Sequence, residues 1–305
     1  MRVLLTSASQ YPARRGGNGS SRVQDSVAKG LGELGHEVLY FVRDGIDGPL
    51  PPGVRASPRG VPDADIYHFN DYPIAGEPPP PGKPWIRGYH APLDSNRANL
   101  PLIDDHFVFV SASHARSYGR TRYVWNGIDP GEFQYAEEKH DYLLFIVSAL
   151  RRAEQKGLRI AIEVAERTKT KLIVGADVDL DPLPEWMRSK YVVYRGEIMD
   201  DEKALLLAFA RALLNPTQVS EPFGLVTAEA MISGTPVIGS RHGACPELIT
   251  SDTGFVCDTI DDYVAAARSA GAIAPQACRQ RAMTEFHYRV MAQRYVIEYE
   301  REMAG

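Results

Sequence analysis

The sequence has no run of about 18 apolar residues, the length that a helix needs to cross a bilayer, so no membrane-spanning helix is predicted. Cysteine is scarce. Cys245, Cys257 and Cys278 form no Cys-x-x-Cys pair and are odd in number, so neither a disulfide framework nor a zinc site is predicted. Positive charge is not in excess, because 34 Lys and Arg stand against 39 Asp and Glu, and nucleic-acid binding is not expected. The segment 1–6 is too short for a signal peptide and is predicted to be a strand, which together with the cysteines favours the reducing cytoplasm.

The 305 residues alternate between short apolar segments and helical segments, and this alternation begins twice, near residues 3 and 142. Such an alternation is typical of parallel sheets with helical crossovers. Proline-rich stretches at 48–62 and 76–84 are predicted to be loops. The expected strands are 3–5, 37–42, 66–69, 85–90, 107–110, 142–147, 171–174, 191–194 and 212–214, and the expected helices include 20–34 and 157–168.

Because the rhythm starts twice, two doubly wound, Rossmann-like α/β domains are predicted, with a single large sheet as the alternative. The expected domains are residues 1–136 and 137–287. The last segment, 288–305, contains a long amphipathic helix.

The most informative stretch begins with Glu221-Pro222-Phe223-Gly224. A predicted helix follows and carries Glu229, and Gly234 is suited to cap its end. A short apolar strand, 237–238, then leads to the turn Gly243-Ala244. One loop carboxylate and one helix carboxylate can thus line a polar cleft at the carboxyl edge of a parallel sheet, where open α/β sheets bind ligands.

This stretch resembles the retaining, nucleotide-sugar-dependent glycosyltransferases of family 4 (glycosyl transferases group 1). Their pattern is a Glu followed after seven residues by a second Glu, with Phe-Gly after the first and Gly-Thr-Pro-Val after the second. The segments 35–38, 124–129 and 253–256 resemble the family's Gly-His-Glu-Val, Asn-Gly-Ile-Asp and Thr-Gly-Phe. The resemblance implies the GT-B fold: two Rossmann-like domains face each other across a cleft, and the last helix crosses back to the N-terminal, acceptor-side domain.

The implied reaction is transfer of a sugar, with retention, from a nucleoside-diphosphate sugar to an acceptor hydroxyl in carbohydrate or natural-product biosynthesis. By resemblance, Glu229 accepts hydrogen bonds from the ribose hydroxyls, and Glu221 meets hydroxyls of the sugar. Backbone amides at glycine-rich loops and helix N-termini can hold the phosphates. The implied donor-binding residues are Gly16, Gly17, Arg151, Arg152, Lys156, Glu221, Phe223, Gly224, Leu225, Glu229, Gly243 and Ala244.

Charge on the departing diphosphate requires basic groups. Lys156-Gly157 matches the family's Lys-Gly, whereas Ser148-Ala149-Leu150 stands where the family has Gly-Arg-Leu. Either a longer loop lets Arg151 or Arg152 take the arginine's role, with Arg152 favoured, or the arginine is missing. His90, at the end of a predicted strand, is placed by resemblance near the transferred sugar, and a structural role is its alternative. The implied catalytic residues are His90, Arg152, Lys156 and Glu221.

Neither a metal nor a cofactor is expected, and the nucleoside-diphosphate sugar is the donor substrate. Asp63-Ala64-Asp65 and Asp177-Val178-Asp179 have the Asp-x-Asp spacing of metal-dependent GT-A transferases, but they look like strand-edge and loop residues. A non-catalytic GT-B binding or scaffold subunit is one alternative, supported by the displaced arginine. Another GT-B enzyme, such as a sugar-nucleotide epimerase, is a second.

The donor's base and sugar, the acceptor, the pathway and the oligomeric state stay open. Because many relatives act on lipid-linked acceptors, peripheral contact with a membrane is a further alternative. Acidic and basic residues are equal in number over residues 1–135, so no basic patch is evident from the charge totals.

Overall fold

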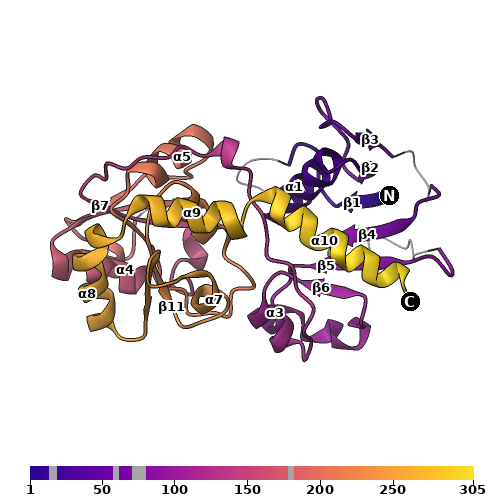
Figure 1. Ribbon diagram of the computed structural model, residues 1–305. Helices are drawn as coiled ribbons and strands as arrows, with labels where there is room; N and C mark the ends of the chain where they lie inside the picture. Colours follow the sequence, from indigo (N-terminus) through magenta and orange to yellow (C-terminus); the bar gives the residue numbers. More distant parts are fainter. Residues whose placement is uncertain (14–18, 58–61, 71–79, 178–181) are drawn as a thin grey trace. The chain divides into compact units, whose positions relative to one another are not determined.

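The computed structural model describes residues 1–13, 19–57, 62–70, 80–177 and 182–305, and Figure 1 shows the path of the chain. Contacts divide the chain into two compact units. The first comprises Met1–Asp129 together with Glu285–Gly305, and the second comprises Pro130–Thr284. Each unit contains a six-stranded parallel sheet. The prediction of Rossmann-like α/β domains is therefore confirmed, and the alternative of a single large sheet is wrong.

Both sheets have the same strand order. The first is β3-β2-β1-β4-β5-β6, and the second, followed from its other edge, is β9-β8-β7-β10-β11-β12. In each sheet the first strand of the chain lies in the middle, and later strands are added first on one side of it and then on the other. The switch from one side to the other lies between β1 and β4 in the first sheet and between β7 and β10 in the second. Ligands bind outside the carboxyl ends of the strands at such switch points. The strands are β1 (Arg2–Ser7), β2 (Glu37–Val42), β3 (Val54–Ala56), β4 (Ile66–Asn70), β5 (Trp85–Tyr89), β6 (Phe107–Phe109), β7 (Tyr142–Ala149), β8 (Lys171–Asp177), β9 (Val192–Tyr194), β10 (Ala212–Asn215), β11 (Val237–Ser240) and β12 (Gly254–Cys257).

The central strands are buried along their whole length because both of their faces are covered. Every residue of β4, β10 and β11 is buried. Polar residues near the strand ends, and the loops that follow them, are therefore the parts of each sheet that can meet a ligand.

One predicted loop contains a strand. Residues 48–62 were expected to be loop throughout, but Val54–Ala56 forms β3, parallel to β2 at the edge of the first sheet. Only Val54 of its three residues is buried. An edge strand this short leaves too little apolar pattern to detect, and prolines are tolerated beside it because an edge strand is paired on one side only.

The predicted helices 20–34 and 157–168 correspond closely to α1 and α4, and α1 buries the expected face of Val23, Val27 and Leu31. The helices of the first unit are α1 (Gly19–Glu33), α2 (Leu93–Asn96), α3 (Ala112–Ser117) and α10 (Tyr288–Met303). Those that begin in the second unit are α4 (Leu158–Thr168), α5 (Asp200–Phe209), α6 (Leu225–Ile232), α7 (Cys245–Leu248), α8 (Ile260–Ser269) and α9 (Pro275–Glu285).

The last helix, α10, packs on α1 in the first unit. The two helices approach closely at Gly30, where an added Cβ would lie 2.6 Å from the Cβ of Ala292. Tyr299 of α10 is fully buried and its hydroxyl lies 2.7 Å from Nδ1 of His68. The end of the chain is thus part of the core of the first unit.

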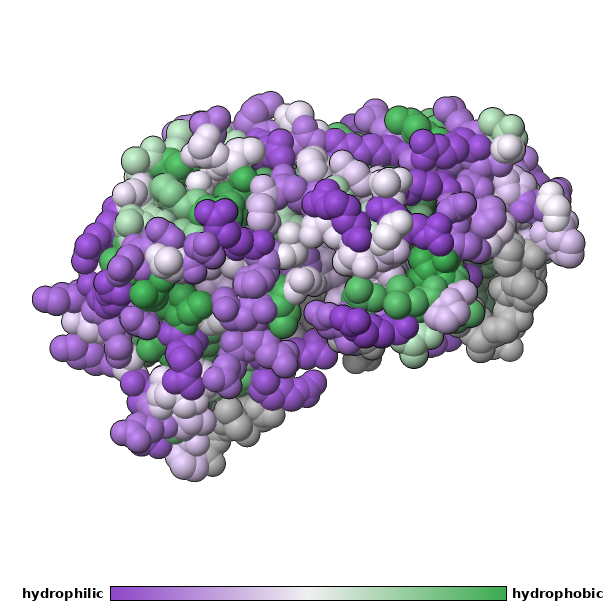
Figure 2. All heavy atoms as spheres, turned by 90° about the horizontal axis from the view of Figure 1, so that it is seen from below, coloured by the Kyte–Doolittle hydropathy of each residue, from purple (hydrophilic) through white to green (hydrophobic). Residues whose placement is uncertain are grey.

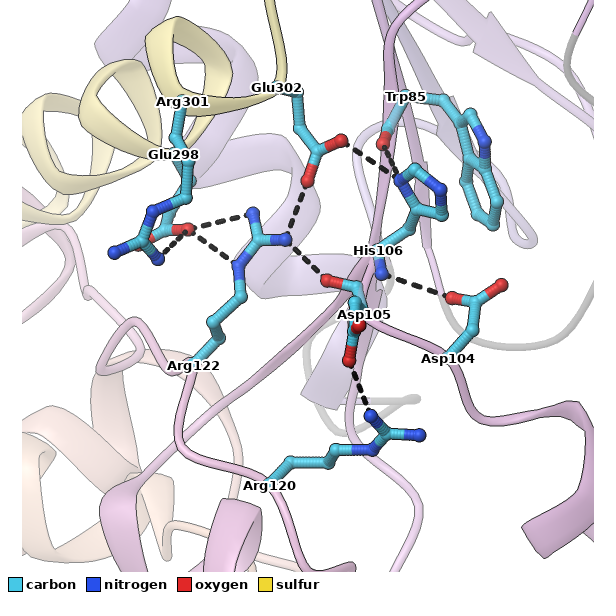
Figure 3. Close-up of polar contacts among 9 residues, drawn as sticks. All are labelled: Trp85, Asp104, Asp105, His106, Arg120, Arg122, Glu298, Arg301 and Glu302. Atoms are coloured by element: carbon cyan, nitrogen blue, oxygen red, sulfur yellow. Dashed lines mark hydrogen bonds and ion pairs between the residues drawn. The ribbon is translucent and has the colours of Figure 1, made fainter. Parts of the chain in front are cut away.

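Ion pairs connect the C-terminal half of α10 with the segments before and after β6, which carry His106 and Arg122 (Figure 3). Arg122 donates to Glu298 at 2.8 Å and to Glu302 at 2.5 Å. Glu302 also lies 2.9 Å from Nδ1 of His106, whose ring stacks on Trp85 with centroids 4.3 Å apart. These carboxylates are nearly buried, so each has a compensating partner, as buried charges require.

In the part of the chain that the structure describes, no helix is long and apolar enough to cross a membrane. Figure 2 shows one face of the molecule, on which apolar residues gather in separate small patches among polar and charged ones. Peripheral contact with a membrane stays a prediction.

Candidate functional site

The candidate site is built from loops at the carboxyl edge of the second sheet. Three neighbouring strands, in the order β11-β10-β7, end at this edge. The loop after β7 carries Lys156, the loop after β10 carries Glu221, and the turn Gly243-Ala244 follows β11. Because the strands are parallel, residues far apart in the sequence meet at the switch point between β7 and β10.

Lys156 and Glu221 form an ion pair, with 2.7 Å between Nζ and Oε1. Both side chains are partly exposed, at 26% and 22%. Their loops are held together by the backbone, because the amide of Gln218 donates to the carbonyl of Gln155. Gly157 lets the loops touch: it has φ +85°, and an added Cβ would lie 2.0 Å from the carbonyl oxygen of Pro216. The lysine is therefore fixed beside the carboxylate by the fold.

The turn after β11 supports Glu221 from its other side. The amide of Ala244 donates to the carbonyl of Glu221 at 3.1 Å. Gly243 has φ +59°, and an added Cβ would lie 2.3 Å from that same carbonyl oxygen. Only glycine combines this backbone conformation with this approach. The predicted Gly243-Ala244 pair thus shapes the loop that carries Glu221.

Helix α6 begins directly after this loop. Its N-cap is Gly224, with φ +86°, which makes no side-chain hydrogen bond to the first amides of the helix. The positive end of a helix with uncapped amides is suited to an anion such as phosphate. Phe223 is buried beneath the turn, and Leu225 is the first helical residue. The four predicted residues Glu221, Phe223, Gly224 and Leu225 therefore lie together at one helix terminus.

Glu229, on α6, is almost fully buried, with 1% of its side chain exposed. Its Oε2 lies 2.5 Å from Nζ of Lys203, which belongs to α5. Sequence reasoning did not single out Lys203. The sequence gives one sign that Lys203 is unusual. It is a lysine near the start of a helix whose first turn otherwise carries only acidic charges, Asp200, Asp201 and Glu202.

Arg151 and Arg152 lie in a short 3₁₀ turn, Leu150–Arg152, on the loop that leads to Lys156. Leu150 is buried, whereas both arginines are exposed. Neither arginine forms an ion pair with another described residue. Two arginines are thus available on the loop of Lys156, and the choice between them stays a prediction.

The remaining predicted residues lie outside this cluster. Gly16 and Gly17 fall outside the described residues. His90 follows β5 in the first unit and is half-buried, and the next carbonyl, that of Ala91, accepts from His114 at 2.8 Å and from Tyr118 at 3.0 Å. A catalytic role for His90 stays a prediction.

Neither Asp-x-Asp segment is described as a metal site. The carboxylates of the first have protein partners, and the second is only partly described. Asp63 pairs with Lys83 at 2.8 Å, and Asp65 accepts from the amide of Arg2 at 2.7 Å. Asp177 ends β8, and the rest of its segment lies outside the described residues. Among described residues, no three His, Cys, Asp or Glu side chains are grouped so that they could hold a metal ion.

Sequence comparison connects the second unit with a known family. Residues 141–272 match the family model for glycosyl transferases group 1. An uncharacterized glycosyltransferase of Methanocaldococcus jannaschii is 32% identical over 152 residues, which cover 43% of this chain and 38% of that protein. Glycogen synthase of Mycobacterium tuberculosis is 29% identical over 197 residues, which cover 55% of this chain and 45% of that protein. The chain therefore spans less than half the length of these relatives.

Solved structures share the fold over nearly the whole chain. A glycosyltransferase involved in avilamycin A biosynthesis has a TM-score of 0.78 and 24% identity, covering 100% of this chain and 98% of its own. An Anabaena protein solved with UDP-glucose has a TM-score of 0.71 and 16% identity, covering 99% of this chain and 100% of its own. The fold is that of the GT-B glycosyltransferases, and the second unit is similar to the glycosyl transferases group 1.

Proposed function

We propose that this protein is a retaining glycosyltransferase of family 4, which moves a sugar from a nucleoside-diphosphate sugar to an acceptor hydroxyl without a metal ion. The observation that carries the proposal is the Lys156–Glu221 ion pair, 2.7 Å long, beside the uncapped amides of α6. It places a cation, a carboxylate and a helix terminus at the switch point of the second sheet, and these groups suit a diphosphate and its sugar.

The diphosphate is the group that leaves, so its growing negative charge has to be stabilised. An ammonium has three donors, so Lys156 can keep its bond to Glu221 and still donate to phosphate oxygens. The first amides of α6 add partial positive charge. Arg151 or Arg152, both exposed on the loop of Lys156, supplies a guanidinium to the same charge.

Two carboxylates divide the recognition of the donor in this proposal. Glu221 is partly exposed and accepts hydrogen bonds from hydroxyls of the sugar. Glu229, farther along α6, accepts from the two ribose hydroxyls, because a carboxylate has two oxygens with several acceptor sites.

Retention is proposed through attack of the acceptor on the same face from which the diphosphate leaves, with the diphosphate taking the acceptor's proton. In this route no carboxylate acts as a nucleophile. The pairing of Glu221 with Lys156 supports it, because an ion-paired carboxylate is a weak nucleophile. No metal is required in this proposal, because the lysine, the arginine and the helix amides together neutralise the diphosphate.

The test is release of nucleoside diphosphate from a panel of nucleotide sugars, with water or added alcohols as acceptors. UDP-glucose is the first donor to try, since the Anabaena protein was solved with it. Lys156→Met should reduce release by about 10²–10³, the effect of losing one charge-stabilising donor, and EDTA should leave native release unchanged. Loss of activity in EDTA, restored by manganese, would refute metal independence. An epimerised sugar without release, or binding without any turnover, would favour one of the two alternatives.

A further inference from the structure

Glu229 is the charged residue in the otherwise uncharged helix α6, and burial of its carboxylate needs an explanation. Residues Thr227–Ile232 are all buried, and Glu229 itself is 1% exposed. An ionised carboxylate taken out of water is costly unless a charge and hydrogen bonds compensate it. The buried carboxylate of Glu229 therefore points to a specific charged partner and to a specific role.

Lys203 is that partner. Its Nζ lies 2.5 Å from Oε2 of Glu229, and 20% of its side chain is exposed. The two residues come from α5 and α6, which pack against each other. The pair therefore connects two helices through one buried carboxylate oxygen.

The position of Lys203 in its own helix is unfavourable. Helix α5 begins at Asp200, so Lys203 lies in the first turn, where the helix dipole disfavours a positive charge. Asp200, Asp201 and Glu202 at the same end are the charges that a helix N-terminus favours. A lysine here is explained by the carboxylate of α6 and not by the stability of α5.

We infer that Lys203 is a positioning residue for recognition of the donor's ribose: it holds the carboxylate of Glu229 in one orientation and compensates its charge. The inference rests on the proposed function, in which Glu229 meets the ribose hydroxyls. Lys203 acts through Glu229, so its effect should be confined to ligands that carry the ribose hydroxyls.

The experiment compares two probes. One is the ribonucleoside diphosphate that native protein binds most tightly, and the other is its 2′,3′-dideoxy analogue; both affinities are measured by calorimetry. Lys203→Met should weaken binding of the ribonucleotide by about tenfold, the scale of one hydrogen bond to a charged group. It should change binding of the dideoxy analogue by less than about twofold, because Glu229 has no hydroxyl to meet there.

Four further variants make the result specific. Lys203→Arg keeps the charge and should retain affinity within about threefold. Glu229→Gln should weaken ribonucleotide binding as Lys203→Met does, and the double variant should lose no more than Glu229→Gln alone, because both residues act through one group. The double variant also contains no unpaired buried charge, so it tests the inference even if Lys203→Met does not fold. Arg195→Met, which removes an exposed pair with Glu202 of the same helix, is the matched control and should change nothing.

The inference is overturned if Lys203→Met binds the ribonucleotide as native protein does, or if it weakens both probes equally. It is also overturned if the double variant loses the product of the two single effects. Native protein that binds no nucleoside diphosphate would instead refute the proposed function. The two failures are therefore distinguishable.

Discussion

Two carboxylates on one short stretch of chain have very different surroundings. Glu221 is 22% exposed and paired with Lys156, while Glu229 is 1% exposed and paired with Lys203. The sequence pattern predicted that both residues are functional and that Lys156 belongs with them. It could not predict Lys203, because that pairing depends on how α5 and α6 are rotated against each other, and no local pattern encodes this rotation.

The exposed arginines give a prediction at the scale of single residues. Arg152→Ala or Arg151→Ala, but not both, should reduce release of nucleoside diphosphate by about 10²–10³, because one preorganised donor to the leaving group is lost. The rate is measured with saturating donor, and each variant is compared with Arg159→Ala, an exposed arginine on the neighbouring helix α4. Full activity in both single variants would show that the arginine's role is missing from this loop.

At the scale of elements, regular structure was largely predictable and an edge strand was not. The predicted strand 37–42 coincides with β2, and the predicted helix 20–34 is shifted by one residue from α1. These elements have long apolar patterns that local periodicity detects. The strand β3 has one buried residue, so pairing with β2 determines it, and pairing over a distance in the sequence leaves no local signal.

The turn after β11 gives a prediction about an element. Gly243→Ala should lower the free energy of unfolding by about 2 kcal/mol or more, because the residue keeps a positive φ and its Cβ meets the carbonyl of Glu221. Nucleoside diphosphate affinity should fall as well, since Glu221 moves with that carbonyl.

The matched control for this variant is Gly271→Ala, also in the second unit, where an added Cβ has no neighbour within 4 Å and φ is not positive. Thermal unfolding and calorimetry measure both variants. Equal stability of the two would show that the turn relaxes without strain and does not determine the position of Glu221.

At the scale of the whole molecule, the two units repeat one strand order but differ in what completes their cores. The first unit includes the last helix, α10, whose Tyr295 and Tyr299 are buried around His68. His68 is completely buried, and no sequence pattern indicated its contact with Tyr299, 231 positions away. The core of the first unit is therefore built from residues of Met1–Asp129 together with α10.

This arrangement predicts how stability depends on pH. Burial, and secondarily the nearby His90, lowers the pKa of His68 to about 3 from its ordinary value of 6.5. Between these values the unfolded chain binds a proton that the folded protein does not, so the contribution of a neutral His68 is complete above pH 6.5 and is lost as the pH falls toward 3. The expected slope is at most about 1.4 kcal/mol per pH unit.

The measurement is urea unfolding of native protein and of His68→Gln at pH 7.5, 6 and 5. Native protein should be more stable at pH 7.5, and its advantage should shrink by about 1–2 kcal/mol by pH 5, because glutamine does not titrate. Tyr299→Phe is the control: it removes the hydroxyl 2.7 Å from Nδ1 but keeps the buried imidazole, so it should retain the pH dependence of native protein. An advantage that stays constant from pH 7.5 to 5 would mean that water reaches His68 when it is protonated, and that α10 does not seal this part of the first unit.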